Sequence, residues 1–281
     1  MKHFKIVWLL LLIFFSPLAF TQKITLAKTD AIKDKYHVAL IKFLLADEED
    51  VEFDVYPKSI SYSRQINEIE NGNLSIAAFG TSESLEKQLL PIRIPILKGL
   101  LGHRIFIIRQ GDQARFDHID SFSELKKFKA GQGRTWADTQ ILKGAGIPTV
   151  TSVKYKNLFH MLDGSRFDYF PRAVHEPFAE IASNSDLPLA LEQNIMLVYP
   201  LAMYLFVSPD NQALADLILT NFEEKIADGS FDQFFFEYPL IQDVLNKVNV
   251  KQRKVIRISN NTLSSETPLD REELWFSVDQ M

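Results

Sequence analysis

The sequence predicts an α/β protein in which two series of alternating strands and helices follow one another along the chain. Short apolar runs of strand type alternate with apolar residues at helical spacing, which favours right-handed crossovers and parallel sheets. The alternation stops at residues 91–102, where prolines and glycines interrupt it, and then resumes. With 281 residues, 46% hydrophobic and 24% charged, the chain can form one large domain or two smaller ones.

The first series predicts three strands and two helices. The strands are expected at residues 24–27, 51–55 and 74–79. The first helix carries Ile32, Tyr36, Leu40, Phe43 and Leu44 on one face, and the second carries Tyr62, Ile66 and Ile69 before the stop signal Asn71-Gly72.

The second series begins with a strand at residues 104–108. Ser121 and Glu124 have the spacing of a capping box, and another helix is expected after Gly133. Later strands are expected at 149–153 and 167–170, and later helices carry Leu158, Phe159 and Leu162 and then Val174, Phe178 and Ile181.

The last third of the chain predicts two short strands within 197–207, on either side of Pro200. A long amphipathic helix carries Leu214, Leu217, Ile218, Phe222 and Ile226 and ends at Gly229. The tail from residue 252 has one strand-like run at 255–258 and ends in Trp275-Phe276, so we expect it to be buried against the rest of the protein.

Charge and cysteine content exclude several classes of function. The 31 basic and 36 acidic residues give a formal charge of −5, which argues against nucleic acid as the main partner. Without cysteine, the chain can form no disulfide, no thiolate metal site and no cysteine nucleophile.

The first 21 residues have the pattern of a secretory signal peptide. Lys2 and Lys5 precede an apolar run at 6–15, and Ala19 and Thr21 fit the small-residue exit. The run is short for a membrane span, although an uncleaved anchor is the alternative. Removing residues 1–21 would bring the charge from −5 to −7. Since a lipoprotein needs a cysteine, we expect a soluble periplasmic protein.

Motifs of common enzymes are missing. There is no nucleophile elbow, no phosphate-binding loop of the Walker type and no zinc-protease helix, and Gly131-Gln132-Gly133 lacks the third glycine of a dinucleotide site. The six histidines are scattered without metal-ligand spacing. The sequence therefore predicts no metal and no cofactor.

Three motifs in order resemble bacterial extracellular solute-binding proteins of the amino-acid-binding-like class, family three. They are Ser123-Glu124-Leu125-Lys126-Lys127 followed by Gly133-Arg134-Thr135, then Leu162-Asp163-Gly164-Ser165-Arg166-Phe167-Asp168, and then Tyr204-Leu205-Phe206-Val207-Ser208-Pro209 with Ile226-Ala227-Asp228-Gly229-Ser230-Phe231. The resemblance covers about residues 23–240. It implies a type II periplasmic-binding-protein-like fold, in which two α/β lobes joined by a two-strand hinge close on a ligand.

The resemblance also implies limits for the lobes. After the predicted signal peptide at 1–21, they are 22–105 for the first part of lobe one, 106–203 for lobe two, and 204–281 for the second part of lobe one with a C-terminal extension. The hinge strands are expected at or near 104–108 and 204–207. Residues 250–281 are expected to wrap lobe one and to stay out of the cleft.

Family position and strand ends together suggest ligand-binding residues. In the family, an arginine clamps the ligand's α-carboxylate and an aspartate holds its amine; here these positions carry Lys87 and Ala173. Each candidate can also have a purely structural role. The glycines can form turns, Lys87 and Arg93 can be surface charges, and Trp136 can be part of the core. Arg172 can form a salt bridge to Glu176. The candidates are Asp30, Gly80, Thr81, Lys87, Arg134, Thr135, Trp136 and Arg172.

The function predicted from these features is capture of a small polar ligand. Lys87, Arg134 and Arg172 predict that this ligand is anionic. The protein would be a monomer that delivers the ligand to an inner-membrane ABC permease or a sensor. Two alternatives remain: a dehydratase-like enzyme that uses Glu176, and an interaction protein that uses its tail.

Overall fold

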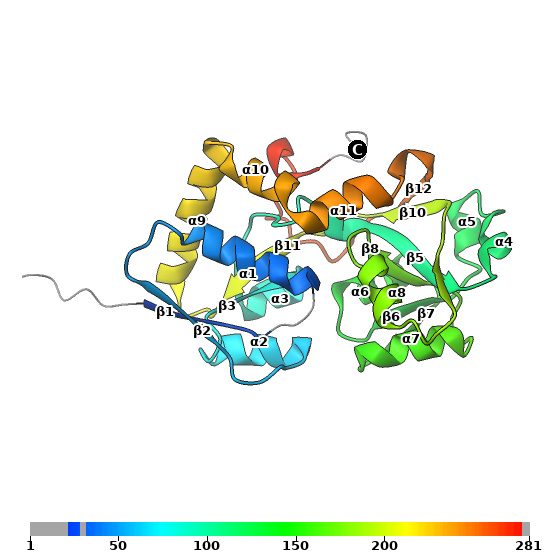
Figure 1. The fold of residues 1–281 in the computed structure, drawn as a ribbon, viewed down its shortest axis with the longest axis horizontal. Helices are drawn as coiled ribbons and strands as arrows, with labels where there is room; N and C mark the ends of the chain where they lie inside the picture. Colours follow the sequence, from blue (N-terminus) through cyan, green and yellow to red (C-terminus); the bar gives the residue numbers. More distant parts are fainter. Residues whose placement is uncertain (1–21, 29–31, 277–281) are drawn as a thin grey trace, which may run out of the picture.

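Two α/β lobes, each built around its own sheets, make up residues 22–28 and 32–276, which are the part of the chain that the computed structural model describes (Figure 1). The predicted signal peptide at 1–21 and the candidate Asp30 lie outside the described residues. No helix in the described ranges is both long enough and apolar enough to cross a membrane.

The first lobe contains the strands of the first series and the late strand that returns to them. β1 (Gln22–Leu26) and β2 (Val51–Val55) pair in parallel, as predicted. β11 (Met203–Val207) lies between β3 (Ile76–Gly80) and β4 (Leu90–Ile92) and runs antiparallel to both, because it enters from the other lobe. The helices here are α1 (Ile32–Leu44), α2 (Tyr62–Glu70), α3 (Glu83–Gln88), α9 (Gln212–Ala227), α10 (Ser230–Glu237) and α11 (Pro239–Lys247).

The second lobe is centred on β5 (His103–Arg109), which pairs antiparallel with β8 (Phe170–Ala173), β9 (Leu189–Leu191) and β10 (Ile195–Val198). A parallel pair, β6 (Ala130–Gly133) and β7 (Thr149–Ser152), lies in the lower part of this lobe in Figure 1, beside α7. Its helices are α4 (Gln113–Phe116), α5 (Phe122–Leu125), α6 (Ala137–Gly144), α7 (Tyr155–Asp163) and α8 (Pro177–Ser183).

The hinge is the place where two chain segments, residues 99–102 and 199–202, pass between the lobes. The Tyr199 amide donates a hydrogen bond of 3.1 Å to the Gly102 carbonyl. A Cβ atom on Gly102 would lie 2.0 Å from the Tyr199 carbonyl oxygen, so only glycine allows the segments to approach this closely. Both crossings lie within a few residues of the strands that the sequence predicts for the hinge.

Two predicted elements are displaced along the chain. The strand expected at 167–170 is β8, which begins at Phe170, and the helix expected from Val174 begins at Pro177. Proline suits the first helical turn because its missing N–H is not needed there. β8 contains Pro171 and Arg172, which do not look like strand residues, and its conformation is set by pairing with β5.

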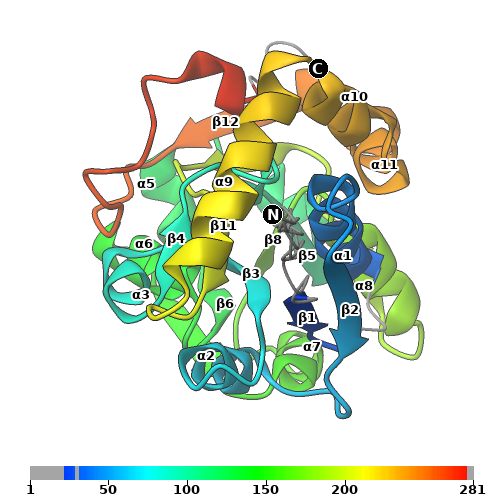
Figure 2. The same cartoon turned by 90° about the vertical axis from the view of Figure 1, so that its left-hand side faces the viewer.

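The tail pairs with a different lobe from the one that the sequence predicts. The strand-like run forms β12 (Lys254–Arg257), which pairs in parallel with β10 and so belongs to the second-lobe sheet, not to lobe one. Apolar residues such as Ile256 indicated that the run would be buried, but they carry no information about which strand edge it covers. The rest of the tail returns to the first lobe, on the side away from α2 and α7 (Figure 2).

Candidate functional site

A cleft of about 500 Å³ lies between the lobes and is lined by both of them. The first lobe contributes the N-terminal turn of α2, one face of α1, β3 and Met203 of β11. The second lobe contributes the segments after β6 and β7, the end of β8 and Arg104 of β5. Ends of parallel strands and N-termini of helices meet here, which is where α/β sheets bind their ligands.

Among the described residues that line the cleft, those of the first lobe include no Asp, Glu, Lys or Arg. Ser61 is extended and precedes the first turn of α2, so Ser61 and Ser63 present hydroxyl groups at a helix N-terminus. The Tyr62 ring packs edge-on against Phe79 with centroids 4.8 Å apart. Burial, and to a smaller degree the charge of Asp138, raises the pKa of Tyr62, so its hydroxyl keeps its proton.

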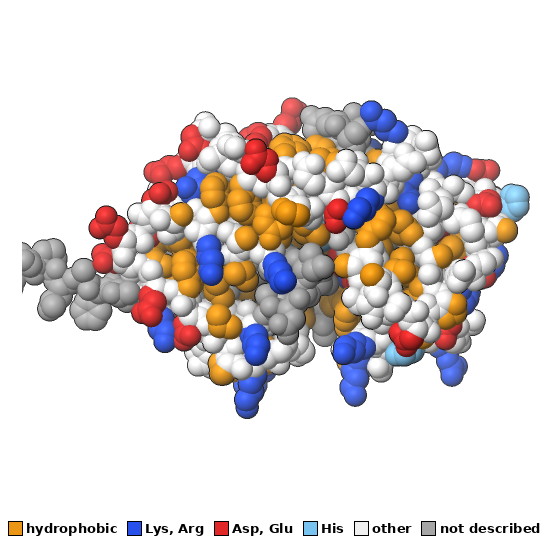
Figure 3. Space-filling view, viewed as in Figure 1, with side chains coloured by type: hydrophobic (Ala, Val, Ile, Leu, Met, Phe, Trp, Pro, Cys, Tyr) orange, Lys and Arg blue, Asp and Glu red, His pale blue; other side chains and the backbone are white. Residues whose placement is uncertain are grey.

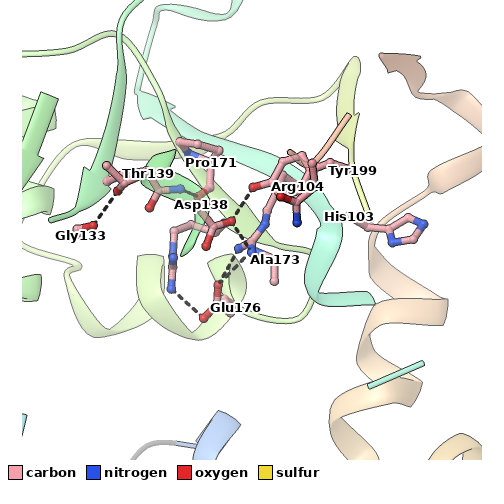
Figure 4. Close-up of polar contacts among 12 residues, drawn as sticks. His103, Arg104, Gly133, Asp138, Thr139, Pro171, Ala173, Glu176 and Tyr199 are labelled. Carbon is pink, nitrogen blue, oxygen red and sulfur yellow. Dashed lines mark hydrogen bonds and ion pairs between the residues drawn. The ribbon is translucent and has the colours of Figure 1, made fainter. Parts of the chain in front are cut away.

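On the second-lobe wall, Trp136 forms an aromatic platform behind a tight turn. A Cβ atom on Gly133 would lie 2.3 Å from the Trp136 ring, so the close approach requires glycine. The Thr139 hydroxyl donates a 2.7 Å hydrogen bond to the Gly133 carbonyl and holds this turn against α6 (Figure 4). Trp136 lies nearly parallel to Phe170, with an interplanar angle of 13°.

Arg172 sits beneath this platform and is fully paired with carboxylates. It is only 2% exposed. Its Nε and Nη2 donate 2.8 Å hydrogen bonds to Glu180, and its Nη2 lies 2.6 Å from Glu176. Burial lowers the pKa of Arg172, but Glu176 and Glu180 more than offset this, so its pKa lies well above the ordinary value. The guanidinium group therefore stays charged and bound to protein carboxylates.

A second buried group of charges connects the cleft to the hinge. Nη2 of Arg104 lies 2.5 Å from Oδ1 of Asp138, and the Tyr199 hydroxyl donates to the same carboxylate (Figure 4). Glu176 lies 3.8 Å from Nη1 of Arg104 and so joins the two groups. Burial, together with Asp138, raises the pKa of Tyr199 far above 10, although Arg104 opposes this.

The cleft rim carries cations that are not neutralised in this way. Arg134 and Lys154 are exposed, line the cleft and form no ion pair with any residue in the described ranges. Val153, 69% exposed, lies beside Lys154. On the face in Figure 3, Lys and Arg side chains also stand out at the lower edge of both lobes. The rim can therefore attract an anion, whereas Arg104 and Arg172 are already paired with the three buried carboxylates of Asp138, Glu176 and Glu180.

Solved structures with a similar fold include amino-acid-binding proteins. An ancestral arginine-binding protein bound to arginine has a TM-score of 0.58 and 17% identity, over 78% of this chain and 98% of that chain. The probable amino-acid ABC transporter extracellular-binding protein ytmK from Bacillus subtilis has a TM-score of 0.58 and 19% identity, over 79% of this chain and 99% of that chain. This chain has the type II periplasmic-binding-protein fold.

A third structure with this fold links binding proteins to an enzyme. The ancestral amino acid-binding protein AncCDT-1, a precursor of cyclohexadienyl dehydratase, has a TM-score of 0.55 and 14% identity, over 77% of this chain and 95% of that chain. No protein-family model matches the sequence, and no curated protein matches it. At these identities the likeness establishes the type II binding-protein fold.

Within this fold, most of the candidate residues lie at the cleft. Gly80, Arg134, Thr135, Trp136 and Arg172 all line it. For Arg172 the plainer alternative also holds, because it forms the salt bridge to Glu176 that the sequence suggested, and a further one to Glu180.

Two candidates do not line the cleft. The Thr81 side chain is buried and its hydroxyl donates a 2.5 Å hydrogen bond to Glu86. Lys87 lies on α3, exposed, and pairs with Glu83 at 2.6 Å. Lys87 was a candidate because of its position in the family's pattern, and it is not among the residues that line the cleft.

Several cleft residues were not among the binding candidates: Ser61, Tyr62, Ser63, Arg104, Asp138, Lys154 and Tyr155. The sequence did contain a signal for residues 61–63 and 152–155, because both stretches include the start of a helix that follows a strand in the chain. Arg104 had no such signal, since it opens an apolar strand. No group of three or more potential metal ligands occurs among the described residues.

Proposed function

We propose that this protein is a periplasmic solute-binding protein that captures a small polar, anionic ligand between its lobes by hinge closure. The observation that carries the proposal is the cleft of about 500 Å³ with walls from both lobes around a two-segment hinge. A site of this size can enclose most of a small ligand, and closure strengthens each polar contact by excluding water. The amino-acid-binding proteins with the same fold support this function.

The ligand's negative charge is proposed from the rim. Arg134 and Lys154 are available to an incoming anion, whereas Arg104 and Arg172 already have carboxylate partners. Gly80, Thr135 and Trp136 provide further contacts, through backbone, hydroxyl and aromatic face. We propose that the monomer then delivers the ligand to an inner-membrane ABC permease or to a sensor.

Mass spectrometry of metabolites released from natively purified protein tests this proposal. We expect a stoichiometric carboxylic acid or similar anion. Arg134→Gln and Lys154→Gln should each weaken rebinding of that acid about tenfold, the loss of one charge-assisted hydrogen bond. Lys87→Gln is the matched control, since it removes a cation outside the cleft. Retention of a cationic ligand, with equal affinity in all three variants, would contradict the anionic proposal.

An enzyme on the same fold is the second candidate, and the position of Glu176 favours it. Glu176 lines the cleft and is buried, as a catalytic carboxylate would be. Its carboxylate lies 2.6 Å from Arg172 and accepts a 2.9 Å hydrogen bond from the Ala173 amide, so its position is fixed. Incubating the released ligand with the protein distinguishes the two functions: an enzyme consumes the ligand and loses that activity in Glu176→Gln, whereas a binding protein returns the ligand unchanged.

A further inference from the structure

In addition to the two hinge segments, the tail passes between the lobes two more times. It leaves the first lobe after α11, adds β12 to the second-lobe sheet, and returns to the first lobe by residue 262. We call residues 253–276 the strap. Figure 1 shows β12 beside β10, and Figure 2 shows the strap running on from it around the molecule.

The second-lobe end of the strap is anchored by a buried ion pair and a strand ladder. Arg253 is 7% exposed, and its Nη1 donates a 3.0 Å hydrogen bond to the Ile195 carbonyl. The same nitrogen lies 3.5 Å from Glu192, a carboxylate with no exposed surface. Every residue of β12 is paired with β10, from Lys254 opposite Ile195 to Arg257 opposite Val198. Withdrawing Arg253 would leave the buried Glu192 carboxylate without its cationic partner, so breaking this end is costly.

The first-lobe end is anchored independently. Arg271 donates two hydrogen bonds, of 2.6 and 2.9 Å, to Glu223 on α9. The Trp275 ring packs on Gly99, where a Cβ atom would come within 2.6 Å of it. Leu274 has no exposed surface and belongs to the main hydrophobic core, which contains residues of both lobes. Packing and a bidentate ion pair therefore hold this end to the lobe that carries α9.

The stretch that joins the two anchors is very short. The Ile258 amide donates to the Val198 carbonyl in the second lobe, and the Thr262 carbonyl accepts from the Glu83 amide in the first. Residues 259–261 alone connect these two points. Asn260 donates a 2.8 Å hydrogen bond to the carbonyl of Pro200 in the hinge, so the middle of the connection is also held.

The strap lies behind the hinge with respect to the ligand cleft. No residue of its described part lines the cleft, whereas a second hollow of about 430 Å³ is lined by hinge residues together with Ile258, Leu269 and Trp275. A rotation of the lobes about the hinge changes the distance between the two anchors. The four Cα–Cα steps from Ile258 to Thr262 reach at most about 14 Å when fully extended, and this length bounds the separation of the two anchors.

We propose that the strap limits how far the two lobes can rotate about the hinge. The inference rests on the described fold and not on the proposed function, and it holds whether the cleft binds a solute or converts one. Lengthening the connection would remove the limit while both anchors and their buried side chains stay in place.

Distance measurements between spin labels test this directly, and the absence of cysteine leaves no background labelling. The labels are placed by Asn67→Cys on α2 and Lys156→Cys on α7, two exposed positions on helices on either side of the gap between the lobes (Figure 1). The test variant carries six Gly and Ser residues inserted between Ser259 and Asn260, which add up to about 20 Å of slack. We expect the ligand-free distance distribution to broaden roughly twofold and to extend beyond the wild-type range.

The same insertion between Ser185 and Asp186, in an exposed turn within the second lobe, is the matched control and should leave the distribution unchanged. Equal distributions in wild type, control and lengthened strap would overturn the proposal. A three-residue insertion after Ser259 provides a second variant. If neither lengthened protein folds while the control does, the strap is required for folding itself, and its assignment as a limit on rotation is wrong.

Discussion

At the residue scale, Arg172 shows how a cleft residue can serve stability first. Its guanidinium group compensates the buried carboxylates of Glu176 and Glu180. Arg172→Ala leaves these two charges without their partner, and we expect the free energy of unfolding to fall by about 3–5 kcal/mol. Urea unfolding followed by circular dichroism measures it. Arg134→Ala, at the exposed rim, is the control and should change stability by less than about 0.5 kcal/mol; equal losses in the two variants would contradict this account.

His103 gives a second prediction at this scale, on pH. Burial, with smaller effects from Arg257 and Arg104, lowers the pKa of His103 to about 4, although its bond to the Gly99 carbonyl opposes this. The unfolded chain therefore binds a proton near pH 6.5 that the folded chain refuses until about pH 4. The neutral imidazole contributes full stability above pH 6.5, and this contribution is lost as the pH falls toward 4.

The pH dependence of unfolding distinguishes His103 from the other titrating groups. Between pH 7 and 4 the wild type should lose up to about 3 kcal/mol more stability than His103→Asn does. Urea midpoints at four pH values measure this difference. Parallel curves for the two proteins would show that His103 does not contribute.

The sequence predicts the positions of several cleft residues but not the contacts of their side chains. It placed Arg134, Thr135, Trp136 and Arg172 at the cleft, because each lies in a segment that follows a strand. The sequence offered a salt bridge to Glu176 as an alternative role for Arg172, but it could not decide between that pair and a contact with a ligand. Glu176 and Glu180, four and eight residues past Arg172, reach it only because β8 turns sharply into α8.

At the element scale, the hinge crossing at Gly102 has no room for a side chain. Gly102→Ala would place a methyl carbon 2.0 Å from the Tyr199 carbonyl oxygen, and the backbone on both sides is fixed. We expect a loss of about 3 kcal/mol or more in stability, or insoluble protein, in a comparison of melting temperatures. Gly164→Ala is the control, because its Cβ would meet its nearest neighbour at 3.2 Å. A Gly102→Ala protein as stable as this control would contradict the close approach.

The strap supplies a second comparison between positions of one element. Leu274 has no exposed surface, whereas Leu269 is 53% exposed. Leu274→Ala should cost about 2–5 kcal/mol, and Leu269→Ala less than about 0.5 kcal/mol, in chemical unfolding. If both substitutions were neutral, the tail would be a loose extension rather than an anchored one.

Helices with a regular apolar spacing were predicted closely. Strands whose position depends on their pairing with other strands were predicted less closely. α1, α2 and α9 follow their apolar spacing closely, since burial of one face fixes a helix locally. β12 was recognised as a strand but not as a part of the second-lobe sheet, and β8 was displaced by three residues. A strand's partner depends on which edge is free, and that is a property of the whole fold.

At the scale of the whole molecule, the two-lobed architecture followed from motif order, and the described structure confirms it. The export prediction concerns residues 1–21, which lie outside the described part. We expect the mature chain to begin within a few residues of Gln22, where β1 begins, and to be found in the periplasmic fraction. Intact-mass measurement after fractionation checks this, and a retained Met1 together with membrane association would contradict it.

The position of β12 has a consequence for the order in which the protein folds. β10 is complete at Val198, but its outer edge is covered only when residues 254–257 arrive, more than fifty residues later in synthesis. Until then the second sheet has an open edge, which slows completion of the fold and invites pairing with other chains. The second sheet is therefore complete only when residues 254–257 are free to pair with β10, so they belong to the last part of the described chain that this sheet needs.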